Sequence, residues 1–125
     1  MYEMYDEVKE ADERKYKYSN INLWLIPEVA NNIEEISYYY IREYIRELLN
    51  NPHLILSVPL ETATEFFNSH GYILKRLHSK RELHDKWKPL SIGAKKRLYY
   101  LLNKKLLEVL NYELQTKTAH PPSTS

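Results

Sequence analysis

The sequence predicts an all-α fold, a helical bundle of about four main helices, because apolar residues recur at three- and four-residue steps over long stretches. The chain also has only two glycines among its 125 residues, which disfavours tight hairpins, while strong helix formers are abundant. We therefore expect a single helical domain over residues 1–125, divided into an N-terminal helical arm (1–26), the bundle (27–115) and a short flexible C-terminal tail (116–125).

The stretch Ser91–Gln115 carries the strongest helical period and the densest positive charge in the chain. Ser91 is a good N-cap residue, so we expect the helix to begin there. Its apolar stripe consists of Leu98, Leu101, Leu102, Leu106, Val109, Leu110 and Leu114. A helix that buries this stripe holds five cations, mostly off the stripe, toward the outside: Lys95, Lys96, Arg97, Lys104 and Lys105.

Residues 2–18 are typical of a polar, highly charged helix with a thin apolar stripe, which we expect to be an arm that packs on another molecule. Its end, RKYKY at Arg14–Tyr18, alternates cations with aromatic rings, a combination that contacts phosphates while stacking on sugars or bases. A loosely docked terminal helix is the alternative interpretation. Residues 19–26 are expected to form a turn followed by a short apolar segment.

A long helix is predicted next. Pro27 suits the first helical position, and the apolar period continues to Asn50, which gives a rod of roughly 33 Å at 1.5 Å per residue. Three consecutive tyrosines cannot all face one way on a helix. We expect Tyr40 inside and at least one of Tyr38 and Tyr39 on a contact surface.

The following segment is expected to be a second helix after an apolar link at residues 53–58. Pro59 opens this helix, and its inner side continues to Leu77. Gly71 interrupts it, and glycine in a helix interior costs about 1 kcal/mol relative to alanine. The helix is therefore expected to kink there or to meet a neighbouring backbone.

Ser79 and Glu82 have the spacing of a capping box, which predicts a short helix that closes at Lys88 and Pro89. A short helix followed by the Ser91 helix has the layout of a helix-turn-helix. The connection KPLS lacks the usual glycine-centred turn, and the second helix is long for a recognition helix, so this layout is kept only as an alternative.

The net charge of +1 conceals an uneven distribution along the chain. Residues 1–67 carry a net charge of −7, and residues 68–125 carry one of +8. Two interpretations follow. Either the halves attract one another inside one fold, or the basic half faces a polyanion while the acidic half contacts the basic half of a neighbouring copy.

The chain carries no pattern typical of an enzyme, and we expect no catalytic residue, no metal, no cofactor and no small-molecule substrate. It has no cysteine, and its five histidines show neither H-E-x-x-H nor metal-ligand spacing. A P-loop and a G-x-S-x-G motif are also absent. Its start lacks the basic and apolar regions of a signal peptide, and no apolar run approaches about 18 residues, so we expect neither secretion by that route nor a transmembrane segment.

Four segments together resemble the major coat proteins of filamentous viruses of hyperthermophilic archaea. They are RKYKY, the YYY of Tyr38–Tyr40, KRLHSKRELHDKWK at Lys75–Lys88, and AKKRLYY at Ala94–Tyr100. The likeness is spread over the whole chain. It implies a helical bundle with an N-terminal arm, in which paired subunits wrap and dehydrate double-stranded DNA held in A form.

The resemblance implies a structural DNA-binding protein of the virion, present in the host cytoplasm during assembly, that polymerises helically around double-stranded DNA. Its partners are then the phosphate backbone, copies of itself and a paralogous coat subunit. Cations neutralise phosphates without reading the base sequence. The expected contacts are Arg14, Lys15, Lys17, Lys75, Arg76, Lys80, Arg81, Lys86, Lys88, Lys95, Lys96 and Arg97.

Other functions stay open on the sequence alone. A small helical subunit of a nucleoprotein effector complex has the same basic side but acts within a defined complex. A helix-turn-helix regulator binds one sequence at least about a thousandfold more tightly than random DNA. A plain protein-binding bundle binds no nucleic acid.

Overall fold

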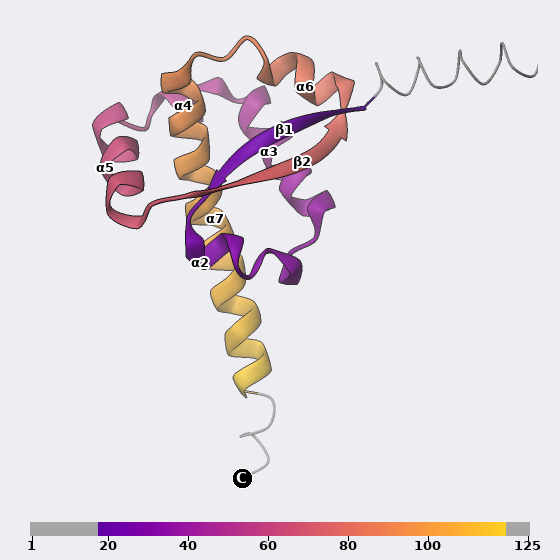
Figure 1. Ribbon diagram of the computed structural model, residues 1–125, viewed down its shortest axis with the longest axis vertical. Coiled ribbons are helices and arrows are strands. Elements are labelled where there is room, and N and C mark those ends of the chain that lie inside the picture. The colour runs from indigo at the N-terminus through magenta and orange to yellow at the C-terminus, as the bar shows by residue number, and fades with distance from the viewer. Residues whose placement is uncertain (1–17, 120–125) are drawn as a thin grey trace, which may run out of the picture.

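The computed structural model describes residues 18–119, with side chains from Ser19 to Tyr112, and it shows a mixed α/β fold. The predicted all-α bundle is therefore wrong. In the described residues, six α-helices and a short 3-10 turn accompany a two-stranded sheet (Figure 1). The elements are β1 (Tyr18–Leu25), α2 (Pro27–Ala30), η1 (Ile33–Glu35), α3 (Tyr38–Asn50), α4 (Pro52–Leu56), α5 (Leu60–His70), β2 (Ile73–Lys80), α6 (Arg81–Trp87) and α7 (Ile92–Ala119).

The two strands form one antiparallel ribbon, which crosses in front of α7 and α3 in Figure 1. The register runs from Tyr18 opposite Lys80 to Leu25 opposite Ile73. The inner face of the ribbon is buried, because four of its side chains are at most 2 % exposed: Ile21, Leu23, Leu25 and Leu77. They join a core that includes Ile41 and Ile45 of α3 and Leu83 of α6.

The sequence at β1 explains why it is a strand and not the predicted turn with an apolar segment. From Ile21 to Leu25 every second side chain is a buried aliphatic one, with Asn22 and Trp24 between them. This is the period of two that places alternate side chains on opposite faces of a sheet. The apolar residues at 21–25 therefore belong to two faces, only one of which is fully buried.

Gly71 ends α5 and makes β2 possible. Its φ of 72° lies in the left-handed region that favours glycine, and its N–H donates to the Phe67 carbonyl at 2.8 Å. The predicted kink is thus a helix end. The predicted continuation of the helix to Leu77 is wrong, because residues 73–80 are a strand.

The predicted helix from Pro27 to Asn50 is broken into α2, η1 and α3. Ser37 begins α3, since its Oγ accepts the N–H of Tyr39 at 3.2 Å. Tyr38 and Tyr39 are 50 % and 67 % exposed, which confirms the predicted surface position. Tyr40 is only partly buried.

Two shorter segments also differ from the prediction. The predicted link at 53–58 contains helix α4. The predicted short helix exists as α6, but Ser79 does not cap it, because Ser79 lies in β2 and is 2 % exposed. The N-cap of α6 is Lys80, without a side-chain hydrogen bond.

α7 confirms the strongest element of the sequence. The Oγ of Ser91 accepts the N–H of Ala94 at 3.1 Å, so Ser91 is the predicted N-cap. The helix continues to Ala119, past the expected end at Gln115 and into the predicted tail. Its buried face includes Leu98, Leu102, Leu106 and Leu110.

Two side chains of α7 close the free edge of β1. Asn103 is fully buried; its Oδ1 accepts the N–H of Ile26 at 2.9 Å, and its Nδ2 donates to the carbonyls of Trp24 at 2.8 Å and Tyr99 at 2.7 Å. The Tyr99 hydroxyl donates to the Asn22 carbonyl at 2.7 Å, and burial raises the pKa of Tyr99 above its usual range. Two side chains of α7 thus satisfy the backbone groups that a third strand would otherwise bond.

Replacing Asn103 with alanine is expected to lower the free energy of unfolding by about 3 kcal/mol, because it leaves buried backbone groups at the β1 edge without partners. Urea denaturation followed by circular dichroism measures this. Asn111→Ala, at an exposed position of the same helix, is the matched control and should change stability little. Equal losses in the two variants would contradict the edge-closing role.

Candidate nucleic-acid interface

The outer face of the ribbon collects polar and basic side chains from both strands. Asn22 lies opposite Arg76, and Asn20 lies opposite His78, whose Nδ1 is 3.4 Å from the Asn20 Oδ1. Lys80 extends the row, and all five side chains are exposed. Neither strand contains Asp or Glu. With eight residues in each strand, the ribbon is roughly 26 Å long and offers an extended hydrogen-bonding face without acids.

An aromatic stack lies at the other end of the ribbon, near the start of β2. Trp24 stacks with Tyr72 at a ring-centroid distance of 4.1 Å and with Tyr99 at 5.5 Å. Phe67 of α5 meets the Trp24 ring edge-on at 5.7 Å. Tyr72 is 45 % exposed, so the stack reaches solvent. Exposed rings beside cations are the usual surfaces on which nucleotides stack.

Three of the predicted cations lie on β2 and are unengaged. Within the described residues, Lys75, Arg76 and Lys80 make no ion pair and no side-chain hydrogen bond, and all three are exposed. Arg76 and Lys80 share the outer face, while Lys75 lies on the opposite side of the strand. These cations are therefore available to an external anion.

Two predicted cations near the start of α7 are held inside the protein. The Nε of Arg97 donates to the Val58 carbonyl at 2.9 Å, which ties α7 to the segment between α4 and α5. The Nζ of Lys95 lies 5.6 Å from the centre of the Trp87 ring, within the range of a cation–π interaction. Both side chains contribute to packing, and Arg97 is the less available of the two for a ligand.

The other four predicted cations of the described chain divide into two that have partners within the protein and two that have none among the described residues. Arg81 pairs with Asp85 at 2.8 Å, and the Lys86 Nζ donates to the Asn50 Oδ1 at 2.9 Å. Lys88 and Lys96 have no partner among the described residues. Arg14, Lys15 and Lys17 lie outside the described residues.

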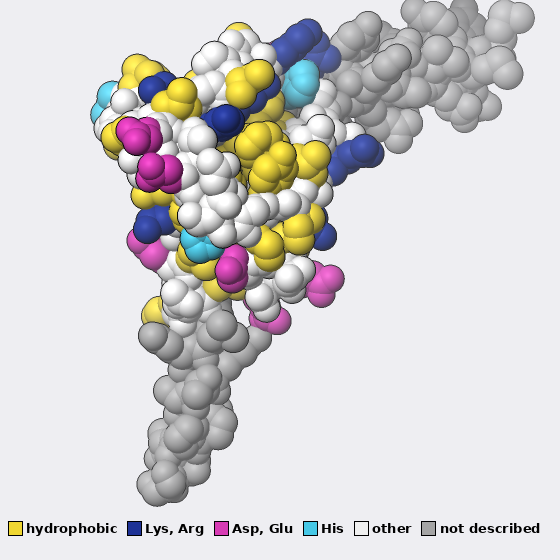
Figure 2. Space-filling model, turned by 60° about the vertical axis from the view of Figure 1, so that its left-hand side comes forward, with side chains coloured by type: hydrophobic (Ala, Val, Ile, Leu, Met, Phe, Trp, Pro, Cys, Tyr) yellow, Lys and Arg dark blue, Asp and Glu magenta, His cyan; other side chains and the backbone are white. Residues whose placement is uncertain are grey.

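On the face that Figure 2 shows, the Lys and Arg side chains of the described residues do not form one continuous positive surface. In Figure 2, Lys and Arg side chains lie singly around hydrophobic ones that gather in the middle of the face shown, and most lie in its upper half. Asp and Glu lie mainly at the left margin and toward the lower end. The structure therefore places Arg76 and Lys80 on one face of the ribbon, whereas several cations of α6 and α7 are engaged within the protein.

The polar side chains that share the outer face with Arg76 and Lys80 were not predicted from the sequence. Asn20 and Asn22 were expected in a turn followed by an apolar segment, and His78 was considered only as one of five histidines without metal-ligand spacing. The available signal was the period of two from Asn20 to Leu25, which marks a strand with a polar outer side.

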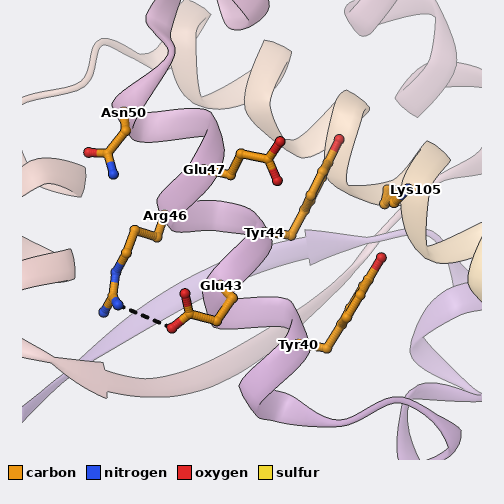
Figure 3. A pocket seen from close by; sticks show the side chains of 7 residues that line it. All are labelled: Tyr40, Glu43, Tyr44, Arg46, Glu47, Asn50 and Lys105. Atoms are coloured by element: carbon orange, nitrogen blue, oxygen red, sulfur yellow. Dashed lines mark hydrogen bonds and ion pairs between the residues drawn. The ribbon is translucent and has the colours of Figure 1, made fainter.

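A pocket of about 500 Å³ lies away from the ribbon, between α3 and α7 (Figure 3). Its lining consists of Tyr40, Glu43, Tyr44, Arg46, Glu47, Asn50 and Lys105. Glu43 pairs with Arg46 at 3.1 Å, and the Lys105 Nζ lies 6.0 Å from the centre of the Tyr44 ring. Burial, followed by the charge of Glu47, raises the pKa of Tyr44. Two of the pocket's four charged side chains, Glu43 and Arg46, thus pair with one another, and a third, Lys105, lies over an aromatic ring.

No protein-family model matches the chain, and neither a curated protein nor a solved structure matches it. In the described part of the chain, no group of three or more His, Cys, Asp or Glu side chains is placed to hold a metal ion. No helix there is both long and apolar enough to cross a membrane.

Arg97→Gln is expected to lower the free energy of unfolding by about 1.5 kcal/mol or more, because it removes a charged donor from a partly buried carbonyl. Lys96→Gln removes the same charge from the neighbouring position, where the side chain has no partner in the described chain, and should change stability by less than about 0.5 kcal/mol. Thermal or urea unfolding distinguishes the two. Equal stability of both variants would contradict a structural role for Arg97.

Proposed function

We propose that the protein binds double-stranded nucleic acid without reading its sequence, through the outer face of the β ribbon. The observation that carries this proposal is the acid-free face on which unengaged Arg76 and Lys80 alternate with exposed polar side chains. A two-stranded antiparallel ribbon fits the major groove of B-form DNA. On an A-form duplex, the same face lies against the wide, shallow groove and its phosphates.

The chemistry of the face favours backbone contacts over base readout. Arg76 and Lys80 are charged and unpaired, so phosphate neutralisation supplies affinity for any sequence. Asn20 and Asn22 are short side chains that donate hydrogen bonds to phosphate or sugar oxygens and hold the ribbon in place. Lys75 lies on the other side of β2. It contacts the phosphates of the second strand of the duplex only if an edge of the ribbon, and not its outer face, lies against the nucleic acid.

A coat protein that polymerises helically around double-stranded DNA is the particular form of this proposal that follows from the resemblance. Its support is the separation of acidic and basic residues along the chain, which suits contacts between neighbouring copies. The helical bundle that the resemblance implies is not the observed fold, so this form depends on charge and not on architecture.

No observation favours the helix-turn-helix alternative, because near the start of α7 Arg97 donates to the Val58 carbonyl and Lys95 lies over the Trp87 ring, so neither extends freely as a base-contacting side chain. The effector-subunit alternative shares the basic ribbon and differs in requiring a defined complex.

The double variant Arg76→Gln/Lys80→Gln is expected to bind a fluorescein-labelled random duplex of about 30 base pairs at least tenfold more weakly near 0.1 M salt. A plot of log affinity against log salt should also be shallower by about 2, since each lost phosphate contact removes about 0.9 from the slope. Fluorescence anisotropy at several salt concentrations measures both quantities.

The matched control is Lys104→Gln/Lys105→Gln, which removes the same charge from α7, where the two Nζ atoms lie over the rings of Tyr100 and Tyr44 and not over a ribbon residue. It should keep most of the affinity and the slope. If the control loses as much as the ribbon variant, the ribbon is not the interface. If the wild-type protein does not bind duplex at low salt, the proposed function is overturned.

The coat form predicts that purified protein and generic double-stranded DNA assemble into regular filaments visible by negative-stain microscopy, and that nuclease then spares the DNA. Raised salt during mixing should prevent assembly, because the contacts are ionic. Free particles beside naked DNA would overturn self-assembly by this chain alone, while leaving duplex binding to be judged by anisotropy.

A further inference from the structure

Within the described residues, the second edge of the ribbon is open along β2 from Leu74 to Arg76. The Asn22 and Trp24 carbonyls point away from β2, since they accept hydrogen bonds from Tyr99 and Asn103. In an antiparallel pair, residues that bond to each other alternate with residues that do not. The residues opposite them, Arg76 and Leu74, must therefore also turn their N–H and C=O groups away from β1 and toward the outer edge of β2.

One point on that edge is already occupied. The Nη1 of Arg42, from α3, donates to the His78 carbonyl at 3.1 Å, which shows that the edge carbonyls are accessible to a donor. Leu74 and Arg76 have no such partner within the described residues. Leu74 is 58 % exposed, and Lys75 and Arg76 are exposed on either side of the strand. The edge from Leu74 to Arg76 is therefore a template for another strand.

We propose that this edge binds an extended acidic segment of a partner protein, which adds to the ribbon as a third strand. β2 carries Lys75, Arg76 and Lys80 with no acid, and β1 carries no charge, so the edge is positive along its length. Acids beside Arg76 and Lys75 complement that charge. A second copy of β2 on the same edge instead brings like charges together, which destabilises strand pairing.

The side chains of β2 also specify the pattern of the bound segment. Leu74 and Arg76 lie two positions apart on the outer face, so the incoming strand presents an apolar residue beside Leu74 and an acid beside Arg76. The main chain supplies affinity and this alternation supplies selectivity. Arg42 at His78 limits the segment at one end, because the next edge carbonyl is taken. Binding of a peptide strand at this edge does not require that the outer face bind nucleic acid, although both proposed surfaces include Arg76.

The probe is a synthetic peptide, TETVTETVT, which places Glu and Val alternately on one face, and its control is TKTVTKTVT. Peptide binding should slow hydrogen exchange at the Leu74 and Arg76 amides, measured by NMR on the wild-type protein, while the amides at the closed β1 edge keep their rates. The lysine peptide should give no protection.

The sharpest variant is Leu74→Pro, with Leu74→Val as its control. Proline removes only the N–H that faces outward, so the bonds between β1 and β2 and the net charge are kept. The affinity of the Leu74→Pro variant for the acidic peptide should fall at least about tenfold, whereas the Leu74→Val variant should bind the peptide like the wild-type protein. Duplex binding should be unchanged in both, since no charge is lost.

Several results would overturn the inference. Unchanged hydrogen exchange at the Leu74 and Arg76 amides in the presence of saturating acidic peptide refutes the site. Equal binding of both peptides refutes the charge selection. Concentration-dependent protection without peptide identifies a second copy as the occupant and refutes the acidic partner. The wild-type exchange measurement decides the matter even if Leu74→Pro fails to fold, and absence of duplex binding leaves the inference intact.

Discussion

The ribbon depends on the contact between Asn103 and the edge of β1. A sheet of two strands is marginally stable by itself, so this one needs support beyond its own hydrogen bonds. The Asn103 amide supplies both an acceptor and donors, and it satisfies Ile26 and Trp24 as a neighbouring strand would. Because Asn103 is fully buried, water cannot replace it. The longest helix is thereby fixed against the strand that carries the exposed polar face.

This support determines which surfaces of the ribbon remain for partners. The inner face is filled by aliphatic side chains, and the β1 edge is closed by α7. What remains is the outer face and the open part of the β2 edge, and Arg76 borders both. A ligand on the outer face uses its side chain, whereas a strand on the edge also uses its main chain. Polyanion and acidic peptide are therefore expected to exclude one another at this residue.

The helices with strong local signals were predictable from the sequence, and the ribbon was not. Ser91 and the leucines that follow it specify α7 through contacts a few residues apart. Ile73, Leu74 and Leu77 fit one side of a helix as well as a strand, and only the pairing with β1, distant in sequence, decides between them. Asn103 gave no local sign of its role, because its partners also lie far away. The same limit applies to cations: nothing near Arg97 in the sequence indicates that Val58 engages it.

The arrangement of ion pairs bears on the uneven charge of the chain. Attraction between an acidic and a basic half inside one fold requires pairs that join the two. The pairs of Arg46 with Glu43, Arg81 with Asp85, and Lys105 with Glu108 each lie within one helix. Such pairs stabilise their own helix by a few tenths of a kcal/mol and do not connect the halves. The contact that does join them is that of the His70 Nδ1 with the Glu28 Oε1 at 3.7 Å, and it is an ion pair only when the imidazole is protonated. Within the described residues, Lys75, Arg76 and Lys80 of β2 have no acidic partner, so these cations remain available to an external anion.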